Sequence, residues 1–196
     1  MEKLNTNFNI ILGSKSPRRI ELLKLMGFNF KIQQLDIDES YPNSLTPTQI
    51  AVFLSKKKAN SYKINKNEVL ICADTIVYMN KIILEKPNTK QEATNMLKMI
   101  SNKKHFVVTG VTLKTIKKEI SFFDTSTVYV NKLTNSEIQY YINNYQPLDK
   151  AGGYGIQEWF GLIAINKIVG SFYNVMGLPT EKVYNKILEL SKTTIK

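Results

Sequence analysis

Apolar and polar positions along the chain follow two different periods, and each period predicts one kind of element. Short apolar runs, typical of strands, cover residues 8–12, 30–34, 69–78, 82–84, 105–116, 120–130 and 162–165. Apolar positions at helical spacing predict helices over residues 17–26, 46–62, 89–100, 134–144 and 180–190. Several strands are joined by short turns, so the pattern favours an α/β fold with a mixed sheet and flanking helices over a purely parallel sheet.

Capping and turn residues support these boundaries. Ser16 is a good N-cap residue, and Pro17 suits the first position of a helix. Gly27 is typical of a residue that ends a helix. Two capping boxes are predicted, over residues 89–92 and 134–137, because each has Thr followed three positions later by Glu.

The composition is that of an ordinary soluble globular protein, with 43 % apolar and 22 % charged residues. A length of 196 residues suits one domain or two small lobes. No apolar stretch is long enough to cross a bilayer, and residues 1–7 have no signal-peptide layout. The single cysteine, Cys72, excludes an internal disulfide and fits a reducing compartment. Because it lies in an apolar run, we expect a core residue and not a nucleophile.

The chain is basic, with a formal net charge of +11 at pH 7. Such a charge favours polyanionic partners, which include nucleic acid, an acidic membrane surface and nucleotides. The lysines are scattered over the whole length, so the charge alone does not choose among these partners.

Residues 14–19 (Ser-Lys-Ser-Pro-Arg-Arg) predict a tight turn followed by the start of a helix. Arg18 and Arg19 then lie in the first helical turn, where the helix dipole is already positive. An anion held by backbone N–H groups and by the two guanidinium groups would resolve this conflict. The alternative is a surface helix with two solvated arginines, and this segment alone leaves the two interpretations about equal.

Asp74 interrupts an apolar strand pattern. Asp is unfavourable in strands, and a buried carboxylate is costly unless it is paired or binds a metal. The pattern favours a functional acid over an aspartate that merely accepts hydrogen bonds from loop amides. Lys86 follows the predicted return strand and precedes Pro87, so a hairpin would bring it towards Asp74.

Other candidates are weaker. The acids at 36, 38 and 39 and the lysine at 58 are typical of solvated surface. The glycine-rich residues 149–157 permit close approach of a ligand to the backbone, and Tyr154 and Gln157 could contact a base, but a flexible turn would have the same composition. His105, the only histidine, fits a structural role at a strand edge. Ligand spacing for zinc is absent, so any metal would be an oxygen-bound one such as magnesium.

Taken together, these segments resemble the Maf family of nucleotide pyrophosphatases over nearly the whole chain. The matching motifs are residues 14–19, 38–41, 58–59, 74–75, 86–87, His105 with 109–111, 149–157 and 170–179. The resemblance implies an elongated α/β fold like that of inosine-triphosphate pyrophosphatases, in one domain that could form two lobes around a central cleft. It also implies a cytoplasmic homodimer that depends on a divalent cation, magnesium or manganese.

The family cleaves nucleoside triphosphates between the α- and β-phosphates. By resemblance, Asp74 is the proton acceptor, and Arg18, Thr75 and Gln157 match positions tied to the choice of base. The motifs are most similar to the branch that acts on dTTP and UTP. One feature does not fit these family roles. Asp74 and Thr75 are adjacent, so their side chains face opposite ways in a regular strand. Lys15 also stands where the family usually has a small or neutral residue.

These residues support a mechanism for phosphoanhydride cleavage, in which cations hold the triphosphate and a carboxylate activates water. Asp74, with Glu39, would hold the divalent cation, and Gln157 would read the imide edge of uracil or thymine. The residues expected to bind substrate are Ser14, Ser16, Arg18, Arg19, Lys58, Thr75, Lys86 and Gln157.

Three alternatives remain open from the sequence. The first is another enzyme of the same family, from the sister branch that acts on 7-methyl-GTP. The net charge also allows a nucleic-acid-binding module without hydrolysis, although no helix-turn-helix, zinc-finger or RNA-stacking signature is found. The third is a regulator of cell division that acts by protein contact. A nucleotide is therefore the expected partner, and neither a membrane nor nucleic acid is expected.

Overall fold

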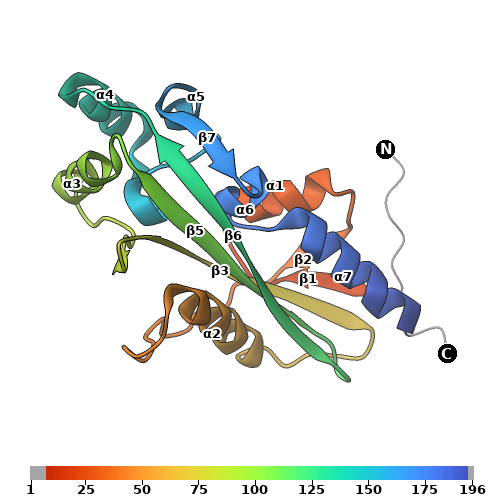
Figure 1. Cartoon of the computed structure of the whole chain (residues 1–196). Coiled ribbons are helices and arrows are strands. Elements are labelled where there is room, and N and C mark those ends of the chain that lie inside the picture. Colours follow the sequence, from red (N-terminus) through yellow and green to blue (C-terminus); the bar gives the residue numbers. More distant parts are fainter. Residues whose placement is uncertain (1–7, 194–196) are drawn as a thin grey trace. The chain divides into compact units, whose positions relative to one another are not determined.

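The computed structural model describes residues 8–193, so the first seven residues, where we expect no signal-peptide layout, lie outside the described part (Figure 1). Within that part, a seven-stranded sheet has the order β2-β1-β3-β5-β6-β7, with β4 paired to β3. The strands are β1 (Asn9–Leu12), β2 (Phe30–Ile32), β3 (Glu68–Met79), β4 (Ile82–Ile83), β5 (Lys104–Lys114), β6 (Glu119–Val130) and β7 (Ile165–Val169). β1 pairs in parallel with β2 and β3, whereas the pairs β3–β4 and β6–β7 are antiparallel. The expected mixed α/β fold is confirmed.

Seven α-helices are described in residues 8–193. They are α1 (Pro17–Leu25), α2 (Pro47–Asn60), α3 (Lys90–Ile100), α4 (Asn135–Tyr145), α5 (Trp159–Ala164), α6 (Phe172–Met176) and α7 (Thr180–Thr193). Two 3₁₀ turns, η1 (Pro147–Asp149) and η2 (Ala151–Gly153), precede α5. None of these helices combines the length and the apolar character that a membrane span requires.

The chain divides into two compact units. The first unit contains residues up to 74, residues 109–124 and residues from 177 onwards, and the second contains residues 75–108 and 125–176. The expectation of one domain with two lobes stays a prediction.

In the first unit, helix α2 packs directly on strand β5. A Cβ atom at Gly110 of β5 would lie 2.3 Å from the backbone carbon of Ala51 in α2, so only glycine permits this approach. One turn further along α2, the hydroxyl groups of Ser55 and Thr112 lie 2.8 Å apart in a buried hydrogen bond. Thr46 caps the start of α2 in a complete capping box with Gln49. These contacts fix the helix that carries Lys58.

Helix α1 starts at the predicted residues, but its first turn is held differently from what a Ser N-cap suggests. Ser16 occupies the N-cap position but makes no side-chain capping hydrogen bond. Its backbone N–H instead donates to the hydroxyl oxygen of Ser14 at 3.2 Å. The predicted helix start, with Ser16 at the N-cap and Pro17 after it, is therefore confirmed, but the turn before α1 is closed by Ser14 and not by the Ser16 side chain.

In the second unit, β3 and β4 form a tight hairpin. Asn80 and Lys81 at its turn have φ of 48° and 68°, the left-handed conformation that such two-residue turns require. The capping box predicted for α4 is present between Thr134 and Glu137. The one predicted for α3 is only half formed, because the carboxylate of Glu92 accepts from the N–H of Asn88, one residue before the N-cap.

Two further expectations for the second unit are wrong. The strand predicted over residues 162–165 is the end of helix α5, and the strand begins only at Ile165. Leu162 is 82 % exposed on this short helix, so its apolar side chain gave a false signal of a buried strand. His105 lies on the inner strand β5 and is fully buried, with its Nε2 2.6 Å from the hydroxyl oxygen of Tyr154, so it is not an edge residue.

Candidate active site

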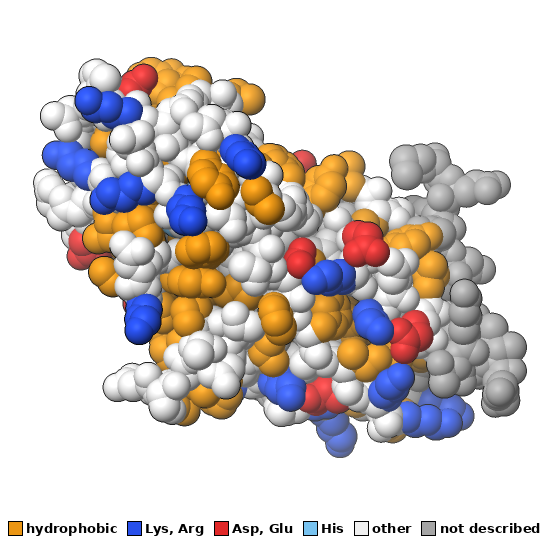
Figure 2. Space-filling model, viewed as in Figure 1, with side chains coloured by type: hydrophobic (Ala, Val, Ile, Leu, Met, Phe, Trp, Pro, Cys, Tyr) orange, Lys and Arg blue, Asp and Glu red, His pale blue; other side chains and the backbone are white. Residues whose placement is uncertain are grey.

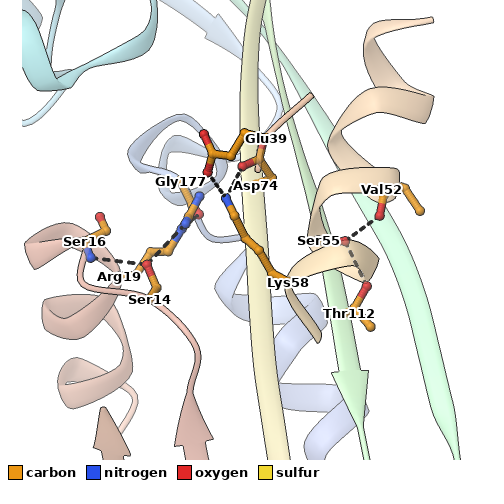
Figure 3. A network of polar contacts seen from close by, with 10 residues as sticks. All are labelled: Ser14, Ser16, Arg19, Glu39, Val52, Ser55, Lys58, Asp74, Thr112 and Gly177. Carbon is orange, nitrogen blue, oxygen red and sulfur yellow. Dashed lines mark hydrogen bonds and ion pairs between the residues drawn. The ribbon is translucent and has the colours of Figure 1, made fainter. Parts of the chain in front are cut away.

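Asp74 in β3 is the centre of a charged cluster in the first unit (Figure 3). Although it belongs to an apolar strand, its carboxylate is paired, because Lys58 of α2 donates to Asp74 Oδ1 at 2.5 Å. The same ammonium group lies 2.7 Å from Oε1 of Glu39. One lysine thus bridges two carboxylates, and the side chains of Lys58 and Asp74 are each only 12 % exposed.

Burial and the nearby cations act in opposite directions on the pKa of Asp74. Burial raises the pKa of this carboxyl group, and the nearby Glu39 also raises it, whereas Lys58 and Arg19 lower it. Burial is the largest effect, so the pKa lies above its ordinary value. The two cations limit this rise and favour the ionised form that can accept a proton.

Arg19 is held in a defined position at the start of α1. Its Nε donates to the backbone oxygen of Gly177 at 2.8 Å, and its Nη1 lies 3.4 Å from the hydroxyl oxygen of Ser14 (Figure 3). Burial lowers the pKa of Arg19, while Asp74 raises it, and an arginine stays charged at neutral pH in either case. The alternative of two solvated arginines therefore does not hold for Arg19, and Arg18 beside it is half-buried.

The acidic loop before α2 is anchored to that helix. Asp38 accepts hydrogen bonds from the hydroxyl group of Ser40, from the backbone N–H of Ser40 at 2.9 Å and from Lys57 at 3.2 Å, and these bonds lower its pKa to about 2. Two consecutive acids thus pair with two consecutive lysines of α2, Asp38 with Lys57 and Glu39 with Lys58. This pairing directs Glu39 towards Asp74. The interpretation of Lys58 as a solvated lysine is wrong, because its side chain is only 12 % exposed, whereas the acids of the loop are exposed as expected.

The cluster can be tested for its fit to a divalent cation. No group of three His, Cys, Asp or Glu residues suited to a metal occurs in the part of the chain that the structure describes. Glu39 and Asp74 nevertheless provide two converging carboxylates, the hard oxygen ligands that magnesium and manganese prefer. Magnesium usually takes one or two carboxylates and completes its shell with water and substrate phosphates, so these residues fit such an ion. The ammonium of Lys58 supplies the positive charge between them here.

Of the other predicted site residues, Arg18 lies in the first unit, and Thr75, Lys86 and Gln157 belong to the second. Thr75 follows Asp74 in β3, which continues to Met79, so the strand does not end at this point. Lys86 and Gln157 are exposed, each in a loop. The structure brings together Ser14, Ser16, Arg19, Glu39, Lys58 and Asp74. A joint site of these residues with Thr75, Lys86 and Gln157 stays a prediction.

No pattern in the sequence indicated several residues that hold Arg19 or the glycine-rich loop in place. Gly177 contributes a backbone oxygen to Arg19, which no side-chain pattern reveals. Tyr141 and Glu158 surround the glycine-rich loop of the second unit, and the spacing of 17 residues between them offered no signal. Cys72, in contrast, is buried as expected, and burial raises the pKa of its thiol to about 12, so it is not a nucleophile.

Comparison with known proteins gives this cluster a family context. Residues 9–190 match the family described as Maf-like protein. The chain belongs to the Maf family. A Maf-family relative from Cytophaga hutchinsonii, named dTTP/UTP pyrophosphatase, is 45 % identical over 194 residues, which cover 95 % of this chain and 89 % of the relative. A relative of the same name from Bacteroides thetaiotaomicron is 45 % identical over 186 residues, which cover 93 % and 96 % of the two chains.

Among solved structures, a HAM1 protein from Coxiella burnetii has a similar fold. The TM-score is 0.52 at 14 % sequence identity, and the match covers 93 % of this chain and 99 % of the other. At this identity the likeness concerns the fold alone. The resemblance to the Maf family that the motifs indicated is confirmed.

Proposed function

We propose that this Maf-family protein hydrolyses dTTP and UTP between the α- and β-phosphates, which yields the nucleoside monophosphate and pyrophosphate. The observation that carries the proposal is the buried Asp74–Lys58 pair beside Arg19. A carboxylate and fixed cations in one cluster are what phosphoanhydride hydrolysis requires. The names of the relatives support the choice of dTTP and UTP as substrates.

Asp74 acts as the proton acceptor for the attacking water. This role requires the carboxylate form, and the contact with Lys58 stabilises that form against the effect of burial. The ion pair and the central strand orient the carboxylate in the free protein, so it is already in position when substrate binds. Geometry and protonation state thus depend on the same contact.

The triphosphate is held by positive charges and by the start of α1. Arg18, Arg19, Lys58 and Lys86 neutralise the phosphates, and the hydroxyl groups of Ser14 and Ser16 donate to them. The N-terminal end of α1 adds the favourable side of the helix dipole. The ion pair of Lys58 with Asp74 and Glu39 loosens when this lysine contacts a phosphate.

Lys86 reaches the site through the β3–β4 hairpin. The N–H of Leu84 donates to the oxygen of Val77 at 2.8 Å, so strand pairing continues past the end of β4. Two more residues in the same register would bring Lys86 opposite Thr75, the neighbour of Asp74 in the chain. This relationship supports the assignment of Lys86 to the site.

Glu39 and Asp74 hold a divalent cation, magnesium or manganese. When bound, such an ion neutralises phosphate charge and lowers the pKa of a coordinated water. The two carboxylates would supply its protein ligands, and the ammonium group of Lys58 would then no longer lie between them.

Gln157 reads the base. Its exposed amide offers one donor group and one acceptor, which match the imide edge of uracil and thymine. Arg18 and Thr75 contribute to the same choice. A site that pairs these groups rejects bases that present the wrong pattern, because buried polar groups would lose their partners.

We further propose that the protein acts as a cytoplasmic homodimer, without a membrane or nucleic-acid partner. On the face drawn in Figure 2, Lys and Arg side chains are dispersed among acidic and apolar ones and do not form a continuous basic stripe. This distribution favours a small anion over a nucleic acid as partner.

A screen of pyrophosphate release tests the proposal. The purified protein is incubated with dTTP, UTP, CTP or 7-methyl-GTP, each with magnesium or manganese, and with Asp74→Asn protein from a parallel preparation as the control for contaminating enzymes. Fast release from dTTP and UTP is expected. Release that does not exceed that of the control would overturn the proposal, and a preference for 7-methyl-GTP would assign the protein to the sister branch.

A further inference from the structure

A second polar network lies in the second unit, around the glycine-rich loop. Tyr141 of α4 donates a short hydrogen bond to Oε2 of Glu158, and its hydroxyl oxygen accepts from the backbone N–H of Gly155 at 2.8 Å. Lys150 lies 3.2 Å from Oε1 of Glu158 and 2.6 Å from Asp149. Both oxygens of Glu158 are therefore engaged, by groups that come from two different segments.

This network is largely removed from water. Lys150 is only 8 % exposed, and the side chain of Glu158 is 19 % exposed. Tyr141 is fully buried, and burial raises the pKa of its hydroxyl group, with a further rise from Glu158. Charged groups in such an environment stay in place only when each of them is paired, so the network is rigid.

Two glycines, Gly155 and Gly161, make room for the network around Glu158. A Cβ atom at Gly155 would lie 2.7 Å from the carboxyl carbon of Glu158, so a larger residue would push this carboxylate away. A Cβ atom at Gly161 would lie 1.7 Å from the backbone oxygen of Ile156, so helix α5 contacts the loop backbone closely. The loop is held at both ends, by the hydrogen bond at Gly155 and by α5.

Gln157 stands between these fixed points. Its side chain is exposed, whereas Gly155 and Ile156 before it are buried and Glu158 after it carries the network. We propose that Tyr141, Lys150 and Glu158 form a clamp that positions the Gln157 amide for recognition of the pyrimidine base. This inference rests on the proposed function, in which Gln157 reads the base, and it makes the three clamp residues positioning residues that touch no substrate.

The clamp acts by preorganisation. A glycine-rich loop loses much conformational entropy when a ligand orders it, and a loop that is already ordered avoids this cost on binding. Loosening the clamp therefore weakens base recognition and raises KM, while kcat changes little, because the group that the clamp positions contacts the base and not the reacting phosphates.

The test uses Tyr141→Phe, which removes the bridging hydroxyl group and keeps the ring. We expect KM for dTTP to rise about tenfold with kcat within about twofold, and discrimination between dTTP and CTP to fall. Tyr145→Phe is the matched control: Tyr145 lies on the same helix, stacks on Tyr141 with ring centroids 5.2 Å apart, and should leave the kinetics unchanged. Glu158→Gln is the second variant, for the case that Tyr141→Phe does not fold.

A double variant separates positioning from mere stability. In a Gln157→Ala background, Tyr141→Phe should cause no further rise in KM, because the group that it positions is gone. An equal rise in both backgrounds would overturn the inference, as would a Tyr141→Phe protein that melts at a lower temperature with unchanged KM and base preference. A wild-type protein that releases no pyrophosphate from any nucleotide would instead overturn the proposed function, and the inference with it.

Discussion

Lys58 and Asp74, from a helix and from the central strand β3, form an ion pair of 2.5 Å in which both side chains are 12 % exposed. A pair so far removed from solvent is sensitive to the loss of either member, because the remaining charge is then buried without its partner. Glu39 completes the arrangement on the other side of the same ammonium group. The effect of a substitution therefore depends on which of the three residues is changed.

Asp74→Asn is expected to give a folded protein with kcat lower by about a thousandfold, the size of effect expected for a lost general base. The amide fits the same space and Lys58 keeps its contact with Glu39, so folding survives. Pyrophosphate release and circular dichroism check the two halves of this prediction. The control is Asp38→Asn, an exposed acid of the neighbouring loop that pairs with Lys57, which should retain activity. Turnover of Asp74→Asn close to that of wild type would remove Asp74 from the proton-transfer step.

Lys58→Met is expected to move the acidic limb of the pH–rate profile to higher pH. Burial already raises the pKa of Asp74, and Lys58 is the main group that lowers it. Without the lysine the pKa rises further, so a larger fraction of the carboxyl group is protonated and inactive at a given pH. The measurement is kcat/KM from pH 5 to 9 for the wild type, Lys58→Met and Lys57→Met. Lys57→Met should have the same acidic limb as the wild type. An acidic limb of Lys58→Met at the wild-type pH would refute the proposed effect of Lys58 on the pKa of Asp74.

The sequence predicted the parts of the candidate site that interrupt a local pattern, and it did not predict those that depend on the path of a loop. Asp74 stands out because a carboxylate breaks an apolar run, and Arg19 because it opposes a helix dipole. Lys58 lies between similar lysines, and its partners Glu39 and Asp74 are 19 and 16 positions away, so only the folded chain distinguishes it. Pairings of this kind are set by tertiary packing and leave no periodic signal.

The same distinction applies to the fold. Long elements such as β3 and α2 were predicted within a few residues, because pattern, capping and turn residues agree there. The helix over 159–164 was mistaken at its end for a strand, because it is short and exposes an apolar residue. The five-residue helix α6 was missed, since so short a segment carries too few turns to show a period.

Gln157→Glu is expected to reduce kcat/KM for dTTP and UTP by more than a hundredfold and to leave the melting temperature nearly unchanged. The glutamate has no N–H donor and adds a negative charge at the place where the base binds, whereas the exposed position tolerates the substitution structurally. The assay compares dTTP, UTP and CTP for both proteins. An unchanged order of preference would exclude Gln157 from base recognition.

His105 is expected to make the free energy of unfolding depend on pH. Burial lowers the pKa of His105 from 6.5 to about 4, so the folded protein holds the neutral ring. The unfolded chain binds a proton below pH 6.5, so stability is complete above that pH and is lost as the pH falls towards 4, by roughly 3 kcal/mol. Urea unfolding at several pH values checks this. The His105→Gln variant can keep a hydrogen bond to Tyr154, but its side chain does not titrate, so this loss of stability at low pH should vanish. A pH dependence of the unfolding free energy equal to that of the wild type would contradict the role of His105.

Gly110→Ala is expected to destabilise the protein by about 3 kcal/mol or more and to lower activity in the fraction that still folds. The new methyl group would lie 2.3 Å and 2.4 Å from the backbone carbon and oxygen of Ala51, and backbone atoms cannot rotate away. Helix α2 must then move off β5, and Lys58 moves with it, away from Asp74. Urea unfolding and pyrophosphate release at a temperature well below melting measure the two effects.

The control for Gly110→Ala is Gly153→Ala. Gly153 has a φ of 73°, but a Cβ atom there would come no closer than 3.7 Å to any group beyond its chain neighbours, so the substitution has only a backbone cost of about 1–2 kcal/mol. If the two variants lose equal stability, steric exclusion between α2 and β5 is not what the glycine at 110 provides. If Gly110→Ala loses stability yet keeps full activity per folded molecule, the position of α2 does not control the Lys58–Asp74 pair.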